Sequence, residues 1–402
     1  MSQSALLTFK MVEEATTPTM WSRWRSVLLP GLVVFLLSLP VFARLCGCDP
    51  HTPYTDYPGH FNFALRIGNG GEKLPHALFH YCLLALMGGP NGFPVAKTAA
   101  VLLALMWGAR AILTAFLLRG NATVSQMSLI VLSLALGVVM TLPNWWKFPS
   151  IYLGQLSPNV WHNPTTLFTI PLILLVFILG NRALESPSLL RVLLVGVAIA
   201  LSILAKPNYA IAYMPCLALG LFIMFCTRHY TSMNWSGLLL RLVLALAPGV
   251  LVLGGQFVST FGKDTAEKSS VVFNPFTVWS LYSPHILASI LLSIAFPLFT
   301  AACYYRSVLK DRALVIAWAT FTVATLQFAL LAEKGPRFDH ANFAWGGILA
   351  NHVLFVACAA FLLRQPIGVK RHLAFGVLAL HVATGLFCLA RCVAHPDFAV
   401  RF

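Results

Sequence analysis

One aspartate lies where few acidic residues are found, in the stretch "YTDYPGHFNF" at residues 54–63. Asp56 follows the first long apolar run of the chain by a short segment, and His60 comes one helical turn later. An acid close to a membrane boundary is costly unless it is solvated, paired or functional. Asp56 could act as a general base. It could equally cap a helix that begins near Pro58, since aspartate is a favoured capping residue.

A second polar stretch, "WHNPTT", combines an aromatic ring with groups that form hydrogen bonds. His162 and Asn163 lie between Trp161 and two threonines, and Gln155 precedes them in the same loop. Sugars stack on aromatic faces and need amide or hydroxyl partners for their own hydroxyls. The stretch therefore indicates a carbohydrate contact. The alternative is an interfacial aromatic belt with a proline turn.

Two further places offer positive charge. Lys206 lies in "AKPN" between two apolar segments, and a later loop, "EKGPRFDHANFAWG", contributes Lys334, Arg337, Asp339 and His340. Arginine binds phosphate through two parallel hydrogen bonds, and lysine acts as a point charge. These residues therefore suit a phosphate group. The alternatives are a lysine that snorkels to water and a loop whose charges neutralise one another.

Composition restricts the class of protein that can hold these residues. The 402 residues are 58% hydrophobic and only 10% charged, whereas soluble domains carry about 25% charged residues. We therefore expect a multi-pass membrane protein. The net charge of +15 is spread singly or in pairs between apolar runs. That pattern is typical of loops facing anionic lipid and argues against a nucleic-acid partner.

Hydropathy predicts an all-α polytopic fold with about 11 transmembrane helices. A helical span needs roughly 20 mostly apolar residues. Segments that fit lie at about 26–43, 97–118, 124–142, 164–181, 187–205, 208–226, 237–258, 285–304, 313–332, 345–363 and 372–390. The stretch 74–89, "LPHALFHYCLLALMGG", is shorter and reads as an interfacial helix. We expect residues 1–402 to form one integral-membrane domain, with no soluble C-terminal domain.

Lysine and arginine predict the orientation. With the N-terminus in the cytoplasm, the short inside loops include "GNRALESPSLLR", "YYRSVLKDR" and "RQPIGVKR", which are rich in basic residues. The first extracytoplasmic loop then covers about 44–96, and the other polar loops described above also lie outside. Function is therefore expected on the extracytoplasmic face. Neither a P-loop, an HExxH motif nor a metal-binding cysteine pattern is present.

Taken together, these features resemble the GT-C superfamily of polyprenyl-phosphate-sugar glycosyltransferases. Asp56 in "YTDYPGHFNFALRI" follows the first span, as in that superfamily. The second helix, "LPHALFHYCLLALMGG", looks like the proline-rich helix of the same loop in the protein mannosyltransferase and aminoarabinose transferase branches. Asp56 has no acidic neighbour, which differs from the branches that carry an Asp-Asp or Glu-Asp pair.

The resemblance implies an inverting transfer from a polyprenyl-phosphate-linked sugar to a glycan, lipid or protein acceptor. Asp56 would be the general base, and Lys206, Arg337 and Lys334 would hold the lipid phosphate. Sugar, acceptor or supporting contacts would come from His60, His162, Asn163, Gln155, His340 and Asp339. The resemblance implies no cofactor, and a transfer that is independent of metal or only weakly dependent on it. We expect the active site to face the periplasm from a bacterial inner membrane and to serve the cell envelope.

Two other classes stay open at the sequence level. A polymerase or ligase of O-antigen-type polysaccharide also has ten to twelve spans, but relies on arginine and histidine in a large outer loop. Here the largest predicted outer loop is the first one. A transporter or flippase needs ionisable residues near the middle of the membrane. The predicted spans contain few of them, Arg110 being the clearest.

Overall fold

The computed structural model describes residues 20–48, 55–71, 77–120, 124–144, 146, 152–230, 233–261, 270–335 and 337–395. The first three residues of the predicted 74–89 helix lie outside these ranges. Nearly all of the described secondary structure is helical. The helices are α2 Met20–Cys46, α3 Tyr57–Gly68, α4 Leu78–Met87, α5 Val95–Arg119, α6 Gln126–Val138, α7 Pro164–Glu185, α8 Leu189–Ala205, α9 Asn208–Cys226, α10 Trp235–Phe261, α11 Thr277–Tyr282, α12 Ile286–Ser293, α13 Ala295–Val308, α14 Arg312–Leu330, α15 Ala344–Leu363 and α16 Val369–Ala394.

The long helices confirm an all-α polytopic membrane protein. Within the described ranges, eight helices are long and apolar enough to cross a membrane, or nine if the bent pair α12–α13 forms one span. Each predicted span coincides with a helix or with this bent pair. However, α6 has 13 residues and α8 has 17, so both fall short of the usual length of a span.

Two predicted spans differ from straight helices of full length. The span predicted at 124–142 ends at Val138, and the amide of Asn159 donates to the carbonyl of Val139 at 2.8 Å. The span predicted at 285–304 is broken, and its halves α12 and α13 meet at 72°. Pro297 explains the break, because a proline in a continuous helix would clash with the carbonyl four residues earlier.

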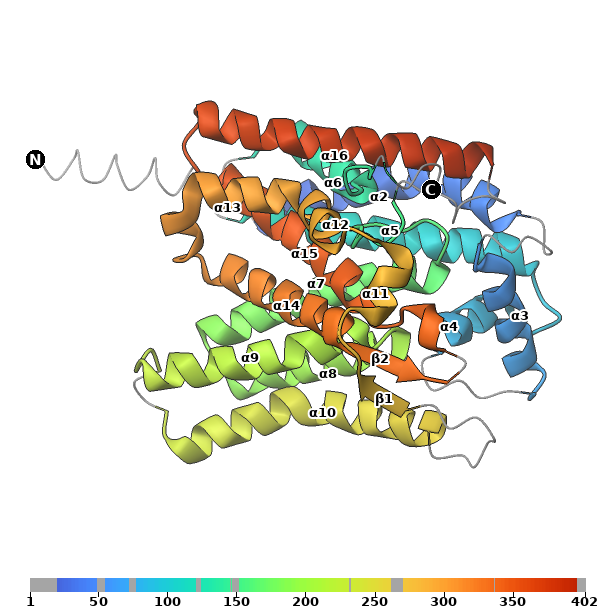
Figure 1. Ribbon diagram of the computed structural model, residues 1–402, viewed down its shortest axis with the longest axis horizontal. Coiled ribbons are helices and arrows are strands. Elements are labelled where there is room, and N and C mark those ends of the chain that lie inside the picture. The colour runs from blue at the N-terminus through green and yellow to red at the C-terminus, as the bar shows by residue number, and fades with distance from the viewer. Residues whose placement is uncertain are drawn as a thin grey trace, which may run out of the picture.

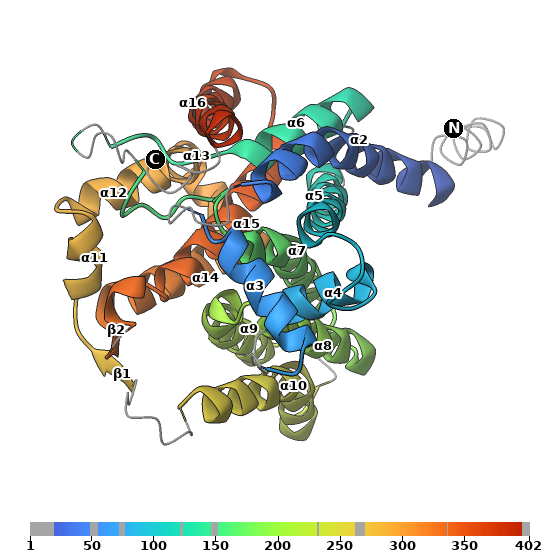
Figure 2. The ribbon, with the colours of Figure 1, turned by 90° about the vertical axis from the view of Figure 1, so that its right-hand side faces the viewer.

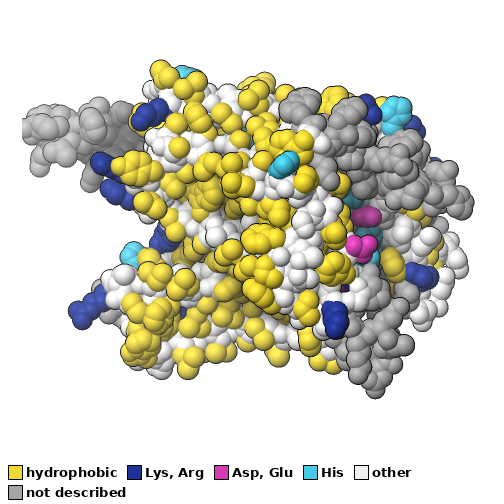
Figure 3. Space-filling view, viewed as in Figure 1, with side chains coloured by type: hydrophobic (Ala, Val, Ile, Leu, Met, Phe, Trp, Pro, Cys, Tyr) yellow, Lys and Arg dark blue, Asp and Glu magenta, His cyan; other side chains and the backbone are white. Residues whose placement is uncertain are grey.

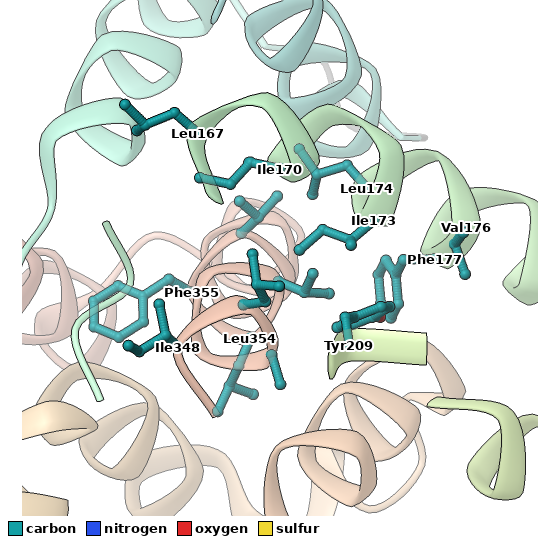
Figure 4. Packing of buried hydrophobic residues seen from close by; sticks show 14 of the residues in the cluster. Leu167, Ile170, Ile173, Leu174, Val176, Phe177, Tyr209, Ile348, Leu354 and Phe355 are labelled. Carbon is teal, nitrogen blue, oxygen red and sulfur yellow. The ribbon is translucent and has the colours of Figure 1, made fainter. Parts of the chain in front are cut away.

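The core of the bundle surrounds α15. This helix is apolar along its length and buried on nearly every side, as expected for a helix without a polar face. Leu354 of α15 faces Ile173 and Phe177 of α7, and Tyr209 of α9 packs beside them (Figure 4). The long helices run roughly parallel or antiparallel to one another, and α3 and α4 lie across one end of the bundle (Figures 1 and 2).

A short antiparallel strand pair also lies at this end of the bundle. Strand β1 covers Ser270–Phe273, and β2 covers Leu331–Lys334. Ser270 faces Lys334, and Phe273 faces Leu331. Neither strand was predicted: β1 lies between the spans predicted at 237–258 and 285–304, and β2 begins within the span predicted at 313–332. The pairing joins the loop after α10 to the loop after α14, at the same end as α3 (Figure 2).

Candidate functional site

Asp56 lies at the start of α3, but its side chain does not cap that helix. It occupies the N-cap position, with Pro58 in the first turn, and makes no capping hydrogen bond. Its Oδ2 instead accepts a 2.6 Å hydrogen bond from Nδ2 of Asn163. Its backbone N–H donates to the carbonyl of His162 at 3.0 Å. The start of α3 is therefore fastened to the segment that precedes α7.

Asn163 occupies the N-cap of α7, directly before Pro164. Its Oδ1 accepts from the backbone N–H of Thr166 at 2.9 Å and from the hydroxyl of Thr165 at 2.8 Å. Asparagine is a preferred N-cap and proline a preferred first helical residue, so "NPTT" favours this geometry locally. With Oδ1 fixed by the cap, the amide nitrogen points to Asp56.

Lys206 reaches the other side of the same asparagine. Pro207 disfavours helical geometry at the residue before it, and Lys206 is extended at the end of α8. Its Nζ donates to the hydroxyl of Thr166 at 2.7 Å and to Oδ1 of Asn163 at 3.3 Å. The ammonium also lies 3.7 Å from the ring centroid of Trp345. Only 9% of Lys206 is exposed, so its side chain points into the protein rather than snorkelling to water.

The charges of Asp56 and Lys206 are linked through Asn163 and do not form an ion pair with each other. The ion pairs within the described ranges involve other residues. Burial is the main cause that lowers the pKa of Lys206, to about 7, and Asp56 opposes this shift. Burial also lowers the pKa of His162, against the effect of Asp56 and with that of Lys206. A bound anion would favour the protonated lysine.

One carboxylate oxygen of Asp56 is available for chemistry. Asn163 holds Oδ2, and no donor from the described part of the chain reaches Oδ1. Asp56 is only partly buried, whereas Thr55 and Tyr57 beside it are buried. The carboxylate is therefore positioned by one oxygen and can accept a proton or a hydroxyl hydrogen bond through the other.

Histidines connect α3 to its neighbours. Nδ1 of His60 lies 3.1 Å from Nε2 of His80 on α4. The ring of His162 lies 6.0 Å from that of Trp345, measured between centroids. His60 therefore contributes to the packing of α3 on α4, and His162 lies beside the ring that contacts Lys206.

The charged loop after α14 lies at the same end of the molecule, but its charged side chains do not join the contacts of Asp56, Asn163 and Lys206. Lys334, Arg337, Asp339 and His340 are all exposed. The loop is tied to the bundle near Lys206 through its backbone, because the carbonyl of residue 342 accepts a 2.8 Å hydrogen bond from the Asn208 side chain. Acidic side chains on the visible face of the molecule lie at this end (Figure 3).

Gln155 contacts its own loop. Its Oε1 accepts from the hydroxyl of Thr141 at 2.7 Å, and its Nε2 donates to the carbonyl of Leu142 at 2.8 Å. The side chain is buried. Both ends of the amide therefore brace the segment after α6, and among the described residues no hydrogen bond joins Gln155 to Asp56.

The structure adds two residues whose part in the site was not predicted. Thr166 is the closest oxygen partner of Lys206, and Trp345 supplies the aromatic face under the ammonium. Thr166 could have been suspected from the second hydroxyl of "WHNPTT". The contact of Trp345 joins residues 139 positions apart in the chain, and nothing in the local sequence indicates it.

The described residues hold no group of three or more His, Cys, Asp or Glu side chains placed to bind a metal ion. Comparison with family models and with curated proteins finds no match to this chain.

Proposed function

We propose that this protein is a membrane glycosyltransferase that moves a sugar from a polyprenyl-phosphate-linked donor to an acceptor hydroxyl. The observation that carries the proposal is the joint attachment of Asp56 and Lys206 to Asn163. A carboxylate with an available oxygen lies on one side of this amide, and a buried ammonium that contacts no carboxylate among the described residues lies on the other. A base and a phosphate-binding cation in such proximity suit group transfer from a sugar phosphate.

In the proposed reaction, Oδ1 of Asp56 accepts the proton of the acceptor hydroxyl as its oxygen attacks the anomeric carbon. The bond between that carbon and the phosphate oxygen breaks, and the polyprenyl phosphate leaves with the bonding electrons. Lys206 stabilises the charge that grows on the phosphate, a contribution that is often the largest one in catalysis. The exposed Arg337 and Lys334 are available to the lipid head group.

The number of membrane crossings and the orientation of the protein are also proposed. We propose eleven crossings, with the shorter α6 and α8 among them, because the helices alternate in direction along the bundle (Figure 1). Helices α3 and α4 would lie in the interface, and the end that carries Asp56 would face the periplasm. The short basic loops at the other end support this orientation.

The direct test is a transfer assay with purified protein in proteoliposomes and a panel of polyprenyl-phosphate sugars. We expect consumption of one donor and release of polyprenyl phosphate. Lys206→Met should lower kcat/KM, and Lys370→Met, which changes an exposed lysine on α16, should not. Movement of an intact lipid-linked sugar across the bilayer without release of polyprenyl phosphate would instead identify a flippase and contradict the proposal.

A further inference from the structure

A cavity lined by described residues lies at the end of the bundle away from Asp56. It has a volume of about 1210 Å³ and runs between α9 and α14. The lining residue of α9 nearest to the candidate site is Pro215, seven positions beyond Asn208. At 1.5 Å per residue, about 11 Å of helix separates the two. The lining contains neither Asp56 nor Lys206 nor their hydrogen-bond partners, so the cavity is distinct from that site.

The walls of this groove are apolar and open to the side. Leu219 and Ile223 of α9 are 57% and 48% exposed, and Val315 of α14 is 39% exposed. The lining extends along α14 from Arg312 to Val323, which is about 17 Å at 1.5 Å per residue. One leaflet of the hydrocarbon core is about 15 Å deep, half of roughly 30 Å. An acyl chain lying along the helices would fit this length.

The mouth of the groove is charged. Arg312 lies 3.4 Å from Glu185, and Arg364 lies 2.5 Å from Asp311. Lys310 also lines the groove and is exposed. Among the described residues, Lys310 forms no ion pair with an acidic side chain. The mouth thus carries three basic and two acidic side chains, and one basic charge is left over for a ligand. In the space-filling view a notch opens between α9 and α14 with basic side chains at its edge (Figure 3).

From these observations we infer that the groove between α9 and α14 is a binding site for an anionic phospholipid. The acyl chain lies between the two helices, and the phosphate group lies at Lys310 with the guanidinium of Arg312 close by. Basic side chains attract anionic head groups at a membrane surface, and lysine stems pack on apolar surface while their ammonium groups reach outward. The basic loops at this end predict that the lipid comes from the cytoplasmic leaflet.

Native mass spectrometry of the full-length protein tests this site. Phosphatidylglycerol and phosphatidylcholine with identical acyl chains are titrated separately. We expect tighter binding of phosphatidylglycerol. Lys310→Ala should weaken it about fivefold, equivalent to ~1 kcal/mol for one basic residue at an anionic surface, and should weaken phosphatidylcholine binding less, because the choline ammonium offsets the charge of its phosphate. Lys370→Ala, which changes another exposed lysine at the same end of the bundle, should change neither.

A second variant tests the apolar part of the groove. Ala319 lines it, so Ala319→Phe should weaken the binding of both lipids. Soluble glycerol phosphate should not compete, since it lacks the acyl chain. Equal affinity of the wild type for both lipids, or unchanged phosphatidylglycerol binding in Lys310→Ala, would overturn the inference. Asp56→Asn should bind phosphatidylglycerol as the wild type does, which separates this test from that of the transferase.

Discussion

Asn163 is the residue through which the two charged groups of the site are connected. It caps α7 with Oδ1 and holds Asp56 with Nδ2, while Lys206 approaches the same Oδ1. Each of these three residues was predicted from the sequence as a separate candidate for the site, because each is a polar side chain beside an apolar segment. The sequence could not predict that they meet, since Asp56 and Asn163 are 107 positions apart and their contact depends on how α3 lies against α7.

Asn163→Asp separates the two roles of this side chain. An aspartate keeps the oxygen that caps α7, but it loses the amide donor to Asp56 and places a second carboxylate against it. A hydrogen bond to a charged group contributes about 1.5–3 kcal/mol, so we expect kcat to fall roughly 10- to 100-fold. The melting temperature should fall less than it does when the cap of α7 is lost as well, because aspartate and asparagine cap helices about equally well.

The control is Asn163→Ala, which removes both contacts and should lower the melting temperature as well as kcat. Transfer assays at saturating donor and thermal melts in detergent provide the two readings. Wild-type kcat in Asn163→Asp would show that the hydrogen bond to Asp56 does not position a catalytic group.

The buried ammonium of Lys206 predicts a pH dependence of stability. Burial lowers its pKa to about 7 in the folded protein, against an ordinary value of about 10.4 when unfolded. Between these values the unfolded chain binds one more proton, so stability rises with pH by about 1.36 kcal/mol per unit. Below pH 7 both states are protonated and this slope disappears.

Lys206→Met should remove this slope. Between pH 7 and pH 10 the wild type should gain stability relative to the variant, on the order of 4 kcal/mol as an upper bound. Unfolding measured in detergent at several pH values gives the slope, with the exposed Lys370→Met as the matched control. Parallel profiles for the wild type and Lys206→Met would contradict a lowered pKa of this lysine.

At the scale of elements, hydropathy located the helices well and their interruptions poorly. Apolar length alone indicates a span, and the predicted span at 285–304 contains enough apolar residues. The break depends on Pro297 and on a contact with another helix. Nε2 of His381 on α16 accepts a 3.3 Å hydrogen bond from the backbone N–H of Phe296. The early end of α6 depends similarly on Asn159. Such partners are distant in sequence, so hydropathy does not reveal them.

The strand pair gives a testable prediction at this scale. Ser270 and Lys334 face each other in β1 and β2, and facing residues of antiparallel strands lie within reach of a disulfide. Ser270→Cys combined with Lys334→Cys should therefore form a cross-link under mild oxidation, identified by peptide mass mapping. The offset pair of Ser270→Cys with Glu333→Cys should not, because a shift of one residue turns the side chain to the other face. Efficient cross-linking of the offset pair alone would show a different register.

At the scale of the whole molecule, composition was sufficient to predict a polytopic helical membrane protein. The low charge content leaves no other way to cover so much apolar surface. The end that faces the cytoplasm is inferred from the loop charges, with the short α4 not counted among the spans. The predicted orientation rests on the short basic loops at the end opposite α3.

Cysteine labelling tests this orientation. Ile367, between α15 and α16, is 79% exposed, and Phe273 in β1 is 73% exposed. In a background with Cys226→Ser, Phe273→Cys should react with an impermeant maleimide in intact spheroplasts. Ile367→Cys should react only after permeabilisation, because the loop that holds it is predicted to be cytoplasmic. The reverse pattern would invert the topology and place Asp56 in the cytoplasm.

In the proposed reaction, Asp56 removes a proton from the acceptor hydroxyl during sugar transfer. The most direct measurement is single-turnover transfer from a bound polyprenyl-phosphate sugar, comparing the wild type with Asp56→Asn in proteoliposomes. Asparagine preserves the size of the side chain and removes its basicity, so the rate should fall about 10²- to 10⁴-fold while the donor still binds. A transfer rate for Asp56→Asn equal to that of the wild type would show that Asp56 is not the base.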